Sequence, residues 1–169
     1  GFVHLDLKPD NILLFNQLEV GISDFAMAKN IKGEDNNGNF TCYKAGSKQY
    51  WSPEMFSNLP YNGVQSDLYA LGITLFIITF GCCPFNEATV EDPYFSKLVH
   101  NPVDFWKIHP ASARRLAEDN ISPELLKLLN YMLCPYPQFR LGITEIKLQK
   151  WFLHYSKQSE IKSLIDQNS

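Results

Sequence analysis

The sequence has no excess of positive charge and few cysteines, and each shortage argues against a class of protein. Its 169 residues carry 15 Lys and Arg against 18 Asp and Glu, a net charge of −3. A general binder of nucleic acid or of acidic membranes needs clustered cations, so we expect neither partner. The four cysteines form no Cys-x-x-Cys pair and no Cys/His spacing typical of zinc. We therefore expect reduced, partly buried thiols and a cytoplasmic protein.

We also expect no targeting segment and no membrane-spanning run of apolar residues. Residues 1–3 show neither the charged nor the apolar region of a signal peptide. The start at Gly1, three residues before the first motif, indicates a piece of a longer chain. The apolar stretch Leu68 to Phe80 is shorter than the roughly 20 residues of a membrane span. A helix that is apolar on all sides belongs in a protein core, so we predict a buried central helix here.

What the sequence does have is enough apolar residues for one well-packed domain. It is 45% hydrophobic and 14% aromatic, which suffices to bury a core. Two short apolar runs, residues 12–15 and 20–22, predict a small β-hairpin. The polar stretch 29–44, rich in Asn and Gly, predicts a mobile loop.

Helices are predicted to fill most of the remaining chain. Ser-Pro-Glu at residues 52–54 and again at 122–124 is a helix-start signal, because Ser caps, Pro suits the first helical position and an acid favours the first turn. One or two short helices are expected in residues 86–120, and a last helix in 144–152. We expect one domain over residues 1–152, followed by a frayed polar tail, 153–169. After the second Ser-Pro-Glu, apolar residues follow i, i+3, i+4, i+7, i+8 spacing: Leu125, Leu128, Leu129, Met132 and Leu133.

Three blocks of residues near the N-terminus carry a family resemblance. They read His-Leu-Asp-Leu-Lys-Pro-Asp-Asn at 4–11, Ser-Asp-Phe-Ala at 23–26, and Gly-Ser-Lys-Gln-Tyr-Trp-Ser-Pro-Glu at 46–54. In this order they resemble the catalytic half of a eukaryotic serine/threonine protein kinase. Residues 92–106 and the ending 150–152 look like the calcium/calmodulin-dependent-like group within that family.

The resemblance implies an α+β, predominantly helical, protein kinase-like fold. The chain resembles the C-lobe, with short β-hairpins beside the catalytic loop, and the N-lobe is absent. No Gly-x-Gly-x-x-Gly loop and no Val-Ala-x-Lys strand occurs in the sequence. We expect that lobe in the parent chain, and we expect the isolated fragment to be inactive.

The same resemblance implies roles for four residues in phosphoryl transfer from ATP to a Ser/Thr hydroxyl of a protein substrate. Such transfer depends on a positioned hydroxyl, neutralised phosphate charge and bound metal. Asp6 stands at the catalytic base, and Lys8 would reach the transferred phosphate. Asn11 and Asp24 would hold Mg²⁺, which prefers amide and carboxylate oxygens.

Further residues match supporting positions of the family. Glu54 and Arg140 match a structural ion pair, and Asp67 matches an acid that anchors the backbone of the catalytic loop. Ser47 stands where a Thr usually contacts the catalytic Asp and Lys. His4 is expected to pack beneath the loop as a structural histidine.

Two positions depart from the family pattern. Leu5 replaces an Arg that pairs with a phosphate on the activation loop, so we expect any activity to be independent of such a phosphate. Ala26 replaces a Gly, and Ala does not adopt a positive φ cheaply, so the movement of Asp24 is expected to be restricted.

Several alternatives stay open at this point. Asp10 is either a site for a basic residue of the substrate or a solvated carboxylate. Glu91 and Asp92 either add to an acidic substrate surface or are simply exposed. The chain itself is either a fragment of an active kinase or a non-catalytic, pseudokinase-like interaction module without the ATP-binding lobe. Retention of the four candidate site residues favours the first interpretation, whereas Leu5 and Ala26 favour the second.

Overall fold

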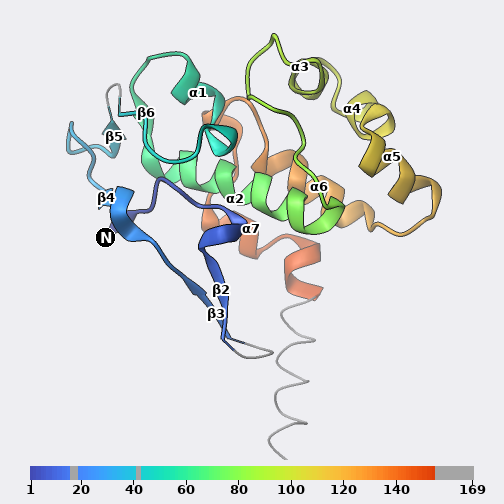
Figure 1. Ribbon diagram of the computed structural model, residues 1–169, viewed down its shortest axis with the longest axis horizontal. Coiled ribbons are helices and arrows are strands. Elements are labelled where there is room, and N and C mark those ends of the chain that lie inside the picture. The colour runs from blue at the N-terminus through green and yellow to red at the C-terminus, as the bar shows by residue number, and fades with distance from the viewer. Residues whose placement is uncertain (16–18, 41–42, 155–169) are drawn as a thin grey trace, which may run out of the picture.

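The computed structural model describes residues 1–15, 19–40 and 43–154 (Figure 1). Helices dominate these residues, and the strands form three separate two-stranded antiparallel pairs. The prediction of an α+β, predominantly helical fold is confirmed. The frayed tail predicted after residue 152 lies, from residue 155 onward, outside the described residues.

The predicted hairpin is present, and it follows directly after residues 4–11, which are the catalytic-loop motif. Strand β2 (Ile12–Leu14) pairs with β3 (Val20–Ile22), and Ile12 lies opposite Ile22. In Figure 1 the hairpin projects away from the helical body. The pairing fixes the distance between the two motifs that flank it, residues 4–11 and 23–26.

The prediction of a mobile loop over residues 29–44 is wrong at two places. Strand β4 (Lys29–Asn30) pairs with β1 (Phe2–Val3), and β5 (Asn39–Phe40) pairs with β6 (Tyr61–Asn62). Both partners are distant in sequence, so the local abundance of Asn and Gly does not reveal them. Short 3₁₀ turns complete the N-terminal region: η1 (Pro9–Asn11), η2 (Phe25–Met27) and η3 (Lys48–Tyr50).

Helix α2 (Gly63–Phe80) is the predicted central helix, and it begins earlier than its apolar stretch. The side chain of Asn62 caps it by accepting a hydrogen bond from the backbone N–H of Gln65, 3.1 Å away. At 18 residues the helix has the length and composition of a membrane span, but 56% of it is buried inside the protein. It packs against α6 and supplies Tyr69, Ile73 and Phe76 to the main core. In Figure 1 it runs through the middle of the molecule.

Three helices, where one or two were expected, cover one end of this core. They are α3 (Pro93–His100), α4 (Pro102–Ile108) and α5 (Pro110–Ala117). Each begins with Pro, which is suited to the first helical position because its missing N–H needs no partner there. Asp92 caps α3 by accepting hydrogen bonds from the N–H groups of Tyr94 and Phe95. It is 8% exposed, so the expectation of an exposed Asp92 is wrong.

The two Ser-Pro-Glu signals have different outcomes. Ser122 caps α6 (Pro123–Met132) through the N–H of Leu125. Ser52 precedes α1 (Pro53–Phe56) but makes no cap, since its hydroxyl is fully buried against that of Ser66, 3.1 Å away.

The end of the described chain differs from the predicted last helix. After the 3₁₀ turn η4 (Pro137–Phe139), helix α7 (Ile143–Lys147) stops five residues before the predicted end. Helical backbone resumes at residues 150–154.

Candidate active site

The catalytic-loop motif is anchored from helix α2 by one carboxylate. Asp67 accepts hydrogen bonds from the backbone N–H groups of His4, at 2.6 Å, and of Leu5, at 2.8 Å. Leu5 has a φ of 63°, a left-handed conformation that costs a non-glycine residue roughly 1–2 kcal/mol. Burial raises the pKa of Asp67, and these two N–H groups offset part of that rise. The predicted anchoring role of Asp67 is confirmed.

His4 joins the loop to the second motif. Its Nδ1 accepts a hydrogen bond from the N–H of Asp6, 3.2 Å away, so Nε2 carries the proton and donates to the carbonyl of Ser23 at 2.9 Å. The ring also lies 5.0 Å from that of Phe25. His4 is 6% exposed, as expected of a structural histidine.

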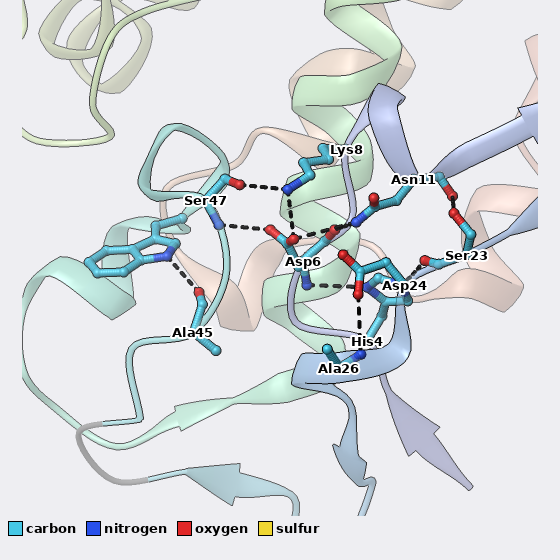
Figure 2. A network of polar contacts seen from close by, with 10 residues as sticks. His4, Asp6, Lys8, Asn11, Ser23, Asp24, Ala26, Ala45 and Ser47 are labelled. Atoms are coloured by element: carbon cyan, nitrogen blue, oxygen red, sulfur yellow. Dashed lines mark hydrogen bonds and ion pairs between the residues drawn. The ribbon is translucent and has the colours of Figure 1, made fainter.

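Asp6 stands at the centre of a polar network (Figure 2). One carboxylate oxygen, Oδ1, accepts from the N–H of Ser47 at 2.7 Å, and Oδ2 accepts from Lys8 Nζ at 2.8 Å. Lys8 Nζ also donates to the hydroxyl of Ser47 at 2.9 Å. The amide nitrogen of Asn11 donates to the Asp6 carbonyl at 2.9 Å. The predicted contacts of Ser47 with the Asp and the Lys are confirmed.

The charges in this network support one another. Burial alone raises the pKa of Asp6, but the hydrogen bonds from Lys8 and Ser47 outweigh it, and the net pKa is lowered. The hydrogen bond to Asp6 raises the pKa of Lys8, and the charges of Asp10 and Asp24 raise it further. Asp6 is therefore a carboxylate and Lys8 a cation near neutral pH.

Gly46 has a role that the motif alone does not predict. It has a φ of 74°, and a Cβ placed there would lie 2.7 Å from Asp6 Oδ1 and would also meet the carbonyl of Leu5. Only glycine permits this approach without a shift. The signal in the sequence is the glycine immediately before Ser47.

Asn11 directly precedes the first strand of the hairpin, β2, and Asp24 follows shortly after its second strand, β3. The Asn11 carbonyl accepts from the N–H of Ser23 at 2.9 Å and from its hydroxyl at 3.2 Å, which holds residues 11 and 23 together. Asp24 is exposed, has a φ of 60°, and accepts a 3.4 Å hydrogen bond from the N–H of Ala26. Ala26 itself lies within η2 and is not among the described residues with positive φ.

The donor set at these two residues fits a hard cation. With the amide nitrogen of Asn11 turned toward Asp6, its oxygen can face a metal, and Asp24 offers a carboxylate. Magnesium takes one or two such protein ligands and completes its shell with water and phosphate oxygens. Among the described residues there is no group of three His, Cys, Asp or Glu side chains that could hold a metal alone.

A buried ion pair holds the third motif to the end of the helical body. Arg140 Nη1 lies 2.8 Å from Glu54 Oε1, and Nη2 lies 3.1 Å from Oε2, a bidentate pair. Arg140 also donates to the carbonyls of Cys134 and Gln65. Its side chain is fully buried, and the predicted structural pair is confirmed.

Leu5 occupies its position as a core residue. It is 6% exposed and belongs to an apolar cluster that includes Val3, Phe40, Ala45 and Met55. Two of these, Phe40 and Ala45, come from the segment between the second and third motifs. Apolar contact thus holds that segment to the catalytic-loop motif.

The fold and the network together define a kinase-type catalytic loop. Residues 1–152 match the family model described as the protein kinase domain, and the chain belongs to that family. CBL-interacting protein kinase 26 of Oryza sativa subsp. japonica is 31% identical over 166 residues, which are 97% of this chain and 30% of that protein. SNF1-like protein kinase ssp2 of Schizosaccharomyces pombe is 33% identical over 150 residues, 89% of this chain and 23% of that protein.

A third relative is also named as a protein kinase. Serine/threonine-protein kinase GIN4 of Saccharomyces cerevisiae is 30% identical over 164 residues, 97% of this chain and 13% of that protein. The resemblance to eukaryotic serine/threonine protein kinases is confirmed. The chain spans about a third or less of the length of these three relatives. The resemblance to the calcium/calmodulin-dependent-like group stays a prediction.

Proposed function

We propose that the protein transfers the γ-phosphoryl group of ATP to a Ser or Thr hydroxyl of a protein substrate, and that this chain supplies the base and the metal ligands. The observation that carries the proposal is the Asp6 carboxylate, held by Ser47 and Lys8 at under 3 Å. A carboxylate with a lowered pKa is ionised at neutral pH. It can therefore orient a substrate hydroxyl and accept its proton.

Lys8 would serve the same reaction through its charge. Its ammonium group bridges Asp6 and Ser47, so it is fixed beside the base without a further partner. A fixed cation at this position favours the negative charge of a transferring phosphoryl group.

Asn11 and Asp24 would hold Mg²⁺, which neutralises phosphate charge when it is bound. Asn11 is buried and tied to Asp6, so its position follows that of the base. Asp24 is exposed and held by one long hydrogen bond to Ala26. We expect the metal and the nucleotide to set the final position of Asp24.

The decisive experiment uses the parent protein immunoprecipitated from cells, incubated with Mg²⁺, γ-labelled ATP and Ser/Thr peptides. Asp6→Asn and Asp24→Asn should each lower phosphate transfer by at least about 100-fold, since each removes a charge on which the step depends. Glu118→Gln, at the exposed residue that follows α5, is the control and should retain wild-type transfer. Full activity in either aspartate variant would overturn the assignment.

A second candidate is a non-catalytic interaction module. It is favoured by the exposed apolar side chains beside Asp24, namely Phe25, 58% exposed, and Met27, 40% exposed. The two functions differ in their need for nucleotide. Tight Mg²⁺-ATP binding by this chain in calorimetry, lost in Asp24→Asn, would count against the module.

A basic residue near the acceptor hydroxyl is proposed as the substrate preference. Asp10 is exposed, and its charge reaches Lys8 in the network. A peptide panel compared between wild type and Asp10→Ala tests the preference, which should weaken in the variant. An unchanged preference would remove Asp10 from the substrate site. We also propose that the protein is located in the cytoplasm. Fractionation of cells tests this location.

A further inference from the structure

Two adjacent cysteines follow the end of the central helix, outside the candidate active site. Helix α2 ends at Phe80, and Gly81 closes it with a hydrogen bond from its N–H to the carbonyl of Ile77. Cys82 is exposed and Cys83 is partly exposed, and both are free thiols. Their sulfur atoms belong to neighbouring residues, so a reaction between them needs no second molecule of this chain.

Cys83 contacts the 3₁₀ turn η3, which directly follows Ser47 of the third motif. The side-chain amide of Gln49 donates to Cys83 Sγ at 2.6 Å. A second tie joins the same two stretches, because Lys48 Nζ lies 2.6 Å from Glu87 Oε1. On the other side, the carbonyl of Cys83 lies 3.2 Å from His109 Nε2. The Cys83 backbone is thus held by His109, which lies between α4 and α5, while its sulfur accepts a hydrogen bond from η3.

The contact to Gln49 leads directly to the polar network. Gln49 lies in η3, whose last residue, Tyr50, donates its N–H to the carbonyl of Ser47 at 2.9 Å. Ser47 in turn contacts Asp6 through its N–H and Lys8 through its hydroxyl. A change at the Cys83 sulfur therefore acts on the 3₁₀ turn that positions Ser47.

We propose that Cys82 and Cys83 form a reversible redox modification site that a small-molecule disulfide oxidises to a vicinal disulfide. The Cys82 thiolate attacks the disulfide, forms a mixed disulfide and releases one thiol. Cys83 then loses its proton and attacks Cys82 Sγ, which forms the Cys82–Cys83 bond and releases the second thiol. Two protein thiols are oxidised, and one disulfide is reduced to two thiols.

Exposure and geometry determine the order and the reversibility of these steps. Burial and the neighbouring Cys82 raise the pKa of the Cys83 thiol, so the exposed Cys82 is the first nucleophile. Consecutive Cα atoms lie about 3.8 Å apart, below the roughly 4.4–6.8 Å usual for a disulfide. A strained bond is more easily reduced, as a regulatory disulfide requires. Its formation turns the Cys83 sulfur toward Cys82 and removes the acceptor of Gln49.

The test uses glutathione disulfide and this chain with its other two cysteines replaced, Cys42→Ser and Cys134→Ser. Intact mass after incubation should show the loss of two hydrogens, and proteolysis should yield one peptide with Cys82 linked to Cys83. In the same background, Cys83→Ser should gain the mass of one glutathione, because no thiol remains to displace it. Cys82→Ser should react much more slowly, since its remaining thiol is partly buried.

Three mass results would overturn the site: unreacted thiols, a persistent glutathione adduct on the intact pair, or a disulfide-linked dimer. The link to η3 has its own readout, the NMR signal of the Gln49 side-chain amide. It should shift on oxidation and return when reduced glutathione is added, and an unshifted signal would overturn the link. None of these measurements depends on phosphate transfer, so the redox site can fail or stand independently of the proposed function.

Discussion

The two halves of the candidate site are held in very different ways. Asp6 is 8% exposed and contacts Ser47, Lys8 and Asn11, while Asp67 fixes the turn before it. Asp24 is exposed and has a single 3.4 Å hydrogen bond, from Ala26, among the described contacts. Asp6, the proposed base, is therefore positioned by the chain itself, and Asp24, the proposed metal ligand, is positioned only loosely by it.

The contrast separates two tasks within one site. A proton acceptor has to be in place before the substrate arrives, and a dense hydrogen-bond network achieves that. A carboxylate that binds a cation gains its order from the cation. Substitutions in the Asp6 half should therefore cost folding stability, and those in the Asp24 half should cost little.

The largest loss is expected from Glu54→Ala. This variant leaves the fully buried Arg140 without its carboxylate partner, which costs roughly 3–5 kcal/mol. Chemical denaturation followed by circular dichroism measures the free energy of unfolding. Glu87→Ala breaks the exposed pair with Lys48 and should cost only about 0–1 kcal/mol. Equal losses of unfolding free energy in both variants would contradict the expected difference between the buried and the exposed ion pair.

Gly46→Ala should have the next largest effect. Gly46 and Gly81 have almost the same φ, 74° and 76°, but a Cβ at Gly81 meets nothing within 4 Å. Gly81→Ala therefore measures backbone strain alone, about 1–2 kcal/mol. Gly46→Ala adds the clash with Asp6 and should cost more in the same unfolding assay. It should also move the NMR signals of Asp6, whereas the Gly81 variant should leave them in place.

Lys8→Met should raise the pKa of Asp6. Burial, the largest influence, remains and raises the pKa, while the main opposing hydrogen bond is lost. In the wild type the lowered pKa adds stability that is present above the unfolded value near 3.8 and is lost as pH falls through the folded value. Carboxyl NMR titration gives the pKa directly. Lys127→Met, on the distant helix α6, is the control, and an unmoved Asp6 pKa in Lys8→Met would contradict the network.

The smallest effect is expected from Ala26→Gly. Ala26 lies within a 3₁₀ turn, and glycine there should lower stability by about 0.5–1 kcal/mol, because it is more flexible in the unfolded chain. Thermal unfolding measures the change. A gain in stability would mean that the backbone at Ala26 is strained in the wild type and that glycine relieves the strain. That result would contradict a loosely held Asp24 segment.

Much of the site could be predicted from sequence because the family resemblance implies it. Asp6, Lys8 and Asn11 belong to one block of that resemblance, and the hydrogen bonds among them follow this block. The partners Asp67 and Arg140 lie far along the chain, and only the family resemblance predicts them. The same limit explains the misplaced loop at 29–44, whose strands pair with residues 2–3 and 61–62.

Other misses concern the environment of single residues. Ser52 has the sequence of a helix cap, yet burial beside Ser66 gives its hydroxyl another partner. Asp92 is a charged residue of a type that is usually exposed, yet it is buried and caps α3. The sequence signal for a third helix was the prolines at 93, 102 and 110, each of which stands at a first helical position.

The apolar cluster around Leu5 determines how the segment before the third motif responds to its surroundings. Contacts between a phosphate and an arginine weaken as salt screens them, whereas packing of Leu5 against Phe40 and Ala45 involves no charge. Apolar association weakens on cooling and is strengthened by sulfate-type salts. The contact of this segment with Leu5 therefore weakens on cooling and is not screened as an ion pair is, and no phosphatase can release it by removing a phosphate from this contact.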